Sequence, residues 1–60
     1  MNGPRPIYVE FVVQGNVVKV TAIDSVTGVE ASIVGPANTP QSTLADAARR
    51  KLEYVLKKRG

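Results

Sequence analysis

The fold is decided by residues 7–24, which read IYVEFVVQGNVVKVTAID. Two runs rich in β-branched residues flank Gly15 and Asn16, and this pattern predicts a β-hairpin closed by a two-residue turn. The turn sets three apolar pairs on one face: Val13 with Val18, Phe11 with Val20, and Val9 with Ala22. Because side chains alternate between the two faces, a shift of one residue would mix apolar and polar positions. The pattern therefore supports this register.

A third strand is expected after residues 24–28, which begin with Asp24 and end with Gly28. Asp is favoured at the start of a turn, and Gly is favoured where φ must be positive. A four-residue loop at this point places Ala31 opposite Ala22 and Ile33 opposite Val20. These pairs lie on the same apolar face that the hairpin predicts.

A helix is expected after residues 35–40, where Gly, Pro and Asn end the strand pattern. Two starts fit the sequence: Thr39 as N-cap before Pro40, or Thr43 opening a capping box with Asp46. After either start, six apolar residues fall within an arc of about 120°, which predicts a helix lying on one sheet face. They are Leu44, Ala45, Ala48, Leu52, Val55 and Leu56.

These elements predict an α+β fold, a three-stranded antiparallel β-meander with one C-terminal amphipathic helix packed on one face (β-β-β-α). We expect one domain over residues 7–59, preceded by a flexible lead at residues 1–6, where two prolines and a glycine leave few backbone groups to pair. The face expected under the helix consists of Val9, Phe11, Val13, Val18, Val20, Ala22, Ala31 and Ile33.

One helix can cover only one face of the sheet, so the opposite face is left to water or to a partner. Its large apolar residues form the candidate interface: Tyr8, Val12, Val17, Ile23 and Val34. Strand propensity alone would explain them, as would face packing or edge pairing between two copies. A 60-residue chain buries only about 60% of its unfolded surface, so a second copy would supply missing core. A polar row of Glu10, Thr21 and Ser32 is expected on this face, as a solvated stripe or a site for a small ligand.

Positive charge gathers at the C-terminus. Residues 46–60 carry six basic residues against Asp46 and Glu53, whereas residues 1–45 carry two basic and three acidic residues. Acidic neighbours four residues away and the helix dipole account for about half of this charge. The rest has two explanations. It is a structural, solvated face in which lysine stems cover a tyrosine ring at the sheet margin, or it is a nucleic-acid contact, because basic side chains beside an aromatic ring can bind phosphate and stack a base. The candidate residues are Arg50, Lys51, Tyr54, Lys57 and Lys58.

Several function classes are excluded by residue type. The sequence has no Cys and no His, which removes disulfides, the zinc sites built from these residues and imidazole-dependent triads. The five acidic residues are scattered over separate predicted elements, so we predict no catalytic residues, no cofactor and no metal, and the chain is not expected to be an enzyme. The longest apolar run is three residues, so we expect no membrane segment and a cytoplasmic protein.

Four segments carry a family resemblance: VKVTAID at 18–24, TGVE at 27–30, SIVGP at 32–36 and RKLEYVL at 50–56. The chain resembles a family of short, uncharacterised alphaproteobacterial proteins, a domain of unknown function, over almost its whole length. The resemblance implies a bacterial, cytoplasmic, stand-alone protein and brings no activity or binding residues with it. The leading interpretation is a small non-enzymatic interaction module, a possible homo-oligomer that self-associates through the uncovered sheet face. The alternative is a weak, sequence-tolerant nucleic-acid binder that uses the basic helix.

Overall fold

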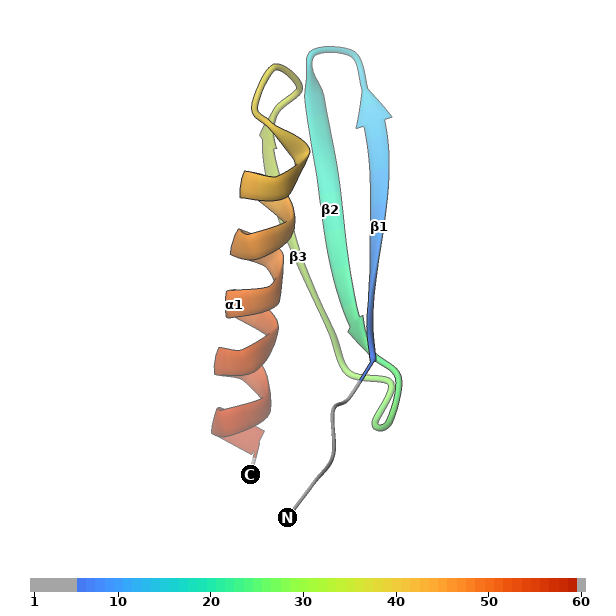
Figure 1. Cartoon of the computed structure of the whole chain (residues 1–60), viewed down its shortest axis with the longest axis vertical. Helices are drawn as coiled ribbons and strands as arrows, with labels where there is room; N and C mark the ends of the chain where they lie inside the picture. The colour runs from blue at the N-terminus through green and yellow to red at the C-terminus, as the bar shows by residue number, and fades with distance from the viewer. Residues whose placement is uncertain (1–5, 60) are drawn as a thin grey trace.

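The computed structural model describes residues 6–59 and has the predicted β-β-β-α order (Figure 1). The elements are β1 (Ile7–Gln14), β2 (Val17–Asp24), β3 (Glu30–Pro36) and α1 (Gln41–Arg59). The strands form one antiparallel sheet in the order β1-β2-β3, so β2 is central and β1 and β3 are its edges. The predicted fold class is confirmed.

Both turns set the predicted register. Gly15 has a φ of 63°, and no non-glycine residue among the described residues has a positive φ. Glycine alone at the first central position is typical of a type II′ hairpin turn, whose twist matches that of the strands. Gly28, with a φ of 77°, ends the second loop. Phe11 consequently lies opposite Val20, and Val20 lies opposite Ile33, as predicted.

The predicted flexible lead falls mostly on residues 1–5, which lie outside the described residues. Pro6 is described, and its carbonyl oxygen continues the β1–β2 pairing. It accepts hydrogen bonds from the backbone N–H of Ser25 at 3.2 Å and from the Ser25 hydroxyl at 2.8 Å. This residue is therefore held against the second loop.

Helix α1 begins at Gln41, one residue after the proline of the first predicted start. The Pro40 carbonyl accepts hydrogen bonds from the N–H groups of Thr43 at 3.1 Å and Leu44 at 3.3 Å. The alternative start at Thr43 is wrong, because Thr43 already belongs to the first turn. Leu44, Ala45, Ala48 and Leu52 are buried, and Val55 and Leu56 are half-buried, so the predicted apolar arc is confirmed.

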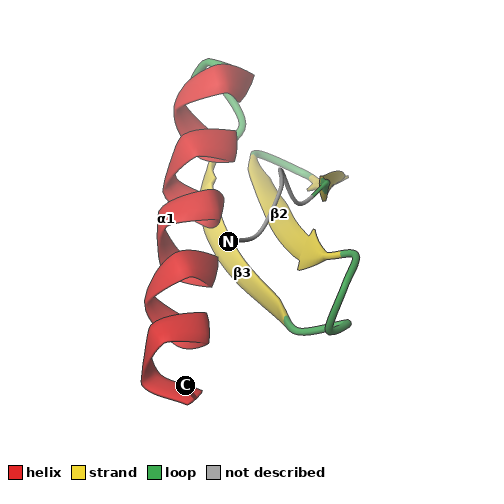
Figure 2. Ribbon diagram, turned by 60° about the horizontal axis from the view of Figure 1, so that its bottom comes forward, coloured by secondary structure: helices red, strands yellow, loops and turns green. Residues whose placement is uncertain are grey.

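The core lies between α1 and the β2–β3 half of the sheet. Figures 1 and 2 show α1 beside β3, with β1 farthest from the helix, and α1 makes few contacts with β1. The buried core consists of Val18, Val20, Ala22, Ala31, Leu44, Ala48 and Leu52. The first turn of the helix packs closely against Gly35 on β3. A Cβ at this position would lie 2.7 Å from Leu44 Cδ2.

The prediction that Val13 belongs to the core is wrong. Val13 is on the helix side of the sheet, opposite Val18, yet 66% of its surface is exposed. A helix with its side chains is about 10 Å wide, whereas three strands spaced about 4.8 Å apart occupy about 14 Å. Because α1 is centred over β2 and β3, the helix-side residues of β1 are covered only in part, and Val9 and Phe11 are half-buried.

Candidate interaction surfaces

The face of the sheet that points away from α1, called here the outer face, carries all five residues of the predicted interface. Three of them, Val12, Val17 and Val34, are between 38% and 65% exposed and are called the outer-face cluster. Val12 and Val34 flank Lys19 in one row across the strands, and Val17 lies in the next row towards the hairpin turn. The three valines therefore surround the stem of one lysine.

Tyr8 and Ile23 lie at the other end of the outer face, opposite each other on β1 and β2. Tyr8 is exposed, whereas Ile23 is half-buried. The row of Glu10, Thr21 and Ser32 separates this pair from the outer-face cluster. The five predicted residues thus form two apolar patches with a polar row between them.

The predicted polar row is aligned across the three strands, but its centre is not solvated. Thr21 is only 8% exposed, and its Oγ1 shares a hydrogen bond of 2.8 Å with Ser32 Oγ. Two of the three polar side chains satisfy each other in this way. The row therefore acts as a cross-strand contact in the sheet.

A second apolar surface lies on the helix side of β1 and was missed by the sequence reasoning. Its residues are Ile7, Val9, Phe11 and Val13, and we call them the β1 shelf. The first three are half-buried and pack against the edge of the core, whereas Val13 projects beyond it. A comparison of widths could have revealed the shelf, because a single helix is narrower than three strands.

Lys51, one of the candidate nucleic-acid contacts, bonds to the sheet. Its Nζ donates a hydrogen bond of 2.7 Å to the backbone carbonyl of Ser32 on β3. Part of the basic surface thus has a structural role. The ammonium group reaches this carbonyl because α1 lies directly over the β3 edge.

Two further basic side chains of α1 make contacts within the helix, one with a carboxylate and one with an aromatic ring. Arg49 Nη1 donates to Asp46 Oδ1 at 3.2 Å. The Lys58 Nζ lies 5.8 Å from the centre of the Tyr54 ring, within cation–π range. Tyr54 is 62% exposed, so the ring and the lysine present a flat surface to solvent. Arg50 and Lys57 are exposed on the same helix.

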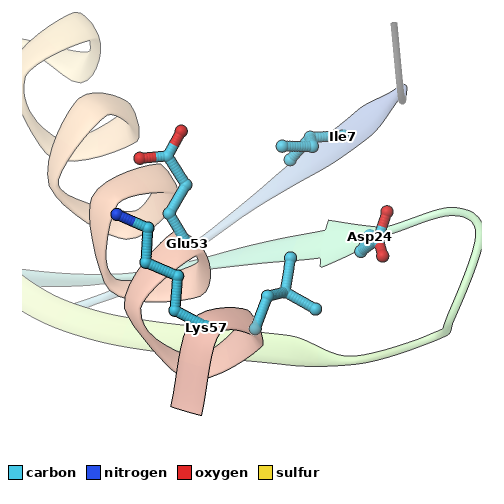
Figure 3. Close-up of a pocket in the computed structure, with 5 residues that line it drawn as sticks. Ile7, Asp24, Glu53 and Lys57 are labelled. Atoms are coloured by element: carbon cyan, nitrogen blue, oxygen red, sulfur yellow. The ribbon is translucent and has the colours of Figure 1, made fainter. Parts of the chain in front are cut away.

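A pocket of about 400 Å³ opens between the start of the sheet and the last turns of α1 (Figure 3). Its lining is Ile7, Asp24, Glu53, Leu56 and Lys57. Asp24 is fully buried, and its carboxylate accepts from the Thr27 hydroxyl at 2.7 Å and from the Val26 N–H at 3.4 Å. These bonds give Asp24 the role of fixing the second loop. The pocket is the end of the gap that α1 leaves beside the β1 shelf.

Within residues 6–59 no group of three or more His, Cys, Asp or Glu side chains could hold a metal ion. The helix in the same range, α1, is not long and apolar enough to cross a membrane.

The fold and these surfaces define a small α+β module, a three-stranded meander with one covering helix and apolar side chains exposed on both faces of the sheet. Residues 4–59 match a family described as a domain of unknown function (DUF6898), so the chain belongs to that family. No curated protein and no solved structure matches the chain.

Proposed function

We propose that this chain is a small non-enzymatic interaction module that self-associates through its sheet. The observation that carries the proposal is the apolar surface left uncovered on the strands. The outer-face cluster is exposed on one side, and Val13 of the β1 shelf is exposed on the other. Clusters of exposed apolar side chains on a small protein are typical of an interaction site.

The size of the core supports the same proposal. Among residues 6–59, the large hydrophobic side chains with no exposed surface are Leu52 and Val20 alone. Small domains have small cores, and many of them gain stability from disulfides, a metal or a second copy. This sequence contains no Cys or His, so a second copy is the stabilising element that its chemistry allows.

Sedimentation velocity of the full chain tests the proposal. Between about 5 µM and 500 µM, a range that brackets typical weak association, we expect the weight-average mass to rise from that of one chain towards that of two. A mass that stays at one chain up to the highest concentration would overturn the self-association.

The second candidate function is weak binding of single-stranded nucleic acid by α1. The exposed Tyr54 ring with Lys58 beside it supports this alternative, and Arg50 and Lys57 add charge on the same helix. Lys51 contributes less, because Ser32 occupies its ammonium group.

A labelled oligonucleotide titrated at two salt concentrations tests this alternative. Backbone contacts release counterions, so binding through three or four basic residues should weaken by roughly 20- to 50-fold between 50 mM and 200 mM salt. The variant Tyr54→Ala should weaken binding further through lost stacking. No binding at the lower salt, or binding without a salt slope, would exclude the alternative.

A further inference from the structure

The two edges of the sheet differ in how their backbone groups are used. We propose that two copies of this chain pair β1 against β1 in antiparallel orientation, forming a six-stranded sheet with both helices on the same side. The inference rests on the self-association proposed above and specifies its geometry.

The outer edge of β1 is open. The hydrogen bond from Ser25 N–H to the Pro6 carbonyl fixes which residues of this strand bond to β2. In an antiparallel ladder such residues alternate, so Tyr8, Glu10, Val12 and Gln14 also bond to β2. The N–H and C=O groups of the β1 shelf residues then point away from the sheet. Within residues 6–59 no turn or side chain caps them, and none of the four is proline.

The outer edge of β3 is partly capped. The bond from Ala37 N–H to the Asn16 carbonyl fixes the alternation on this side, so the backbone groups of Glu30, Ser32, Val34 and Pro36 point outward, and two of these residues are capped. The Ser32 carbonyl accepts from Lys51 Nζ at 2.7 Å. The Pro36 carbonyl accepts from Thr39 N–H at 3.0 Å, and proline has no N–H to offer. Lysine and proline are typical means of protecting an edge strand, and between residues 7 and 59 they cap groups on β3 but none on β1.

The side chains of β1 favour the same pairing. A two-fold axis perpendicular to the sheet keeps the helix side of each copy on the same side of the assembly. The two β1 shelves then form one apolar strip between the two helices. This strip covers Val13, which α1 of its own chain leaves exposed.

The single charge on β1 excludes the register centred on Glu10. Glu10 is the only charged residue of the strand, and two like charges directly opposite each other are unfavourable. Pairing Phe11 with Phe11 of the second copy avoids this contact, because Glu10 then lies opposite Val12. The same register sets Val9 opposite Val13, so apolar residues of the shelf face one another.

The position of the basic helix end favours the antiparallel orientation. Lys57 lines the pocket together with Ile7, so the last turn of α1, with Lys57, Lys58 and Arg59, lies at the Ile7 end of β1. In the proposed register the two Ile7 ends are eight positions apart, roughly 27 Å along the strands. This exceeds the screening length of about 8 Å in physiological salt. A parallel pairing would bring both basic ends together.

Three valine-to-lysine variants of matched exposure test the geometry by sedimentation. Val13 on the β1 shelf, Val34 in the outer-face cluster and Val26 in the second loop are 66%, 65% and 67% exposed. Equal exposure means that each lysine should be tolerated by the fold, which circular dichroism and thermal unfolding can verify. We expect Val13→Lys to raise the dissociation constant of the dimer by about tenfold or more, because it introduces a charge into the apolar strip. Val26→Lys, the control outside both candidate interfaces, should change it by less than about twofold. Val34→Lys reports on the alternative packing through the outer-face cluster.

Disulfide trapping provides a second readout that does not weaken the interface. The chain has no Cys, so Val9→Cys and Val13→Cys can be made singly and mixed. Opposite residues in a hydrogen-bonded pair have Cα atoms about 5.5 Å apart, within the range that a disulfide spans. We expect cross-linked dimers from the mixture and few from either variant alone. In the proposed register each position lies four residues away from the same position in the second copy.

The outcomes separate the two proposals. A dimer that only Val34→Lys weakens would indicate face-to-face packing, which overturns the β1 pairing and leaves the self-association intact. A dimer without cross-links in the mixture would also overturn the pairing. A wild-type chain that stays monomeric would overturn both.

Discussion

Gly35 and Lys51 show how single residues fix the position of α1 on the sheet. Gly35 leaves room for the Leu44 side chain against the β3 backbone, and Lys51 bonds to the Ser32 carbonyl seven residues further along the helix from Leu44. One contact is steric and the other is a charged hydrogen bond. Together they place α1 over the β3 edge at two points of its length.

The close approach at Gly35 makes a larger side chain costly. A Cβ would lie 2.7 Å from Leu44 Cδ2, so Gly35→Val should force Leu44 or the helix to move. We expect the free energy of unfolding to fall by about 1–3 kcal/mol, the usual effect of overpacking a core. Urea denaturation measures this change.

A double-mutant cycle provides the control for this prediction. Leu44→Val removes the atom that the new side chain would meet, so Gly35→Val should cost less in that background. Equal costs in both backgrounds would show that the effect comes from the strand backbone and not from the contact with Leu44.

At the scale of elements, the lateral position of the helix decides which strand residues carry the core. Val20 on β2 has no exposed surface, whereas Val13 on β1 is mostly exposed, although both point to the helix side. The same residue type thus has two roles on one face. The difference depends only on the distance of each strand from the axis of α1.

Alanine substitutions measure this difference directly. Val20→Ala should lower the free energy of unfolding by about 2 kcal/mol, from lost burial and the cavity left behind. Val13→Ala should lower it by less than about 0.5 kcal/mol, provided that both are unfolded by urea at concentrations where the chain is monomeric. Equal effects would mean that α1 also covers β1.

The order of elements, both turns and the strand register could be predicted from the sequence, because each depends on local patterns. Gly15 and Gly28 mark the loops, and the alternation between Val9 and Val13 marks the face. The placement of the five candidate residues on the outer face follows from the same alternation. The turns, the register and the strand faces all depend on residues that are close together in the sequence.

The lateral position of α1 could not be predicted, since helical periodicity gives a buried face but no position across the strands. The exposure of Val13 and the bond from Lys51 to Ser32 both depend on this position. The burial of Thr21 is likewise set by its neighbours on both adjacent strands. The β1 shelf and the partly capped β3 edge therefore became visible only in three dimensions.

At the scale of the whole molecule, stability and assembly are coupled if the folded chain self-associates. Unfolded chains do not form the pairing, so mass action stabilises the folded dimer as concentration rises. A hundredfold increase in protein concentration should raise the Tm by on the order of 5 °C for a domain of this size. Calorimetry at two concentrations measures this shift. A Tm independent of concentration would contradict the coupling.

In the proposed pairing, the partly capped edge of β3 would also limit how far assembly proceeds. A sheet with two open edges can add strands from new chains at both ends and grow into a fibre. In this chain Lys51, Thr39 and Pro36 occupy or remove hydrogen-bonding groups on one edge. If β1 is the edge that adds a strand, each molecule pairs with one other chain and growth stops at the dimer. Acetylation of Lys51 removes its charge, which would weaken its bond to the Ser32 carbonyl and expose one more acceptor on the β3 edge.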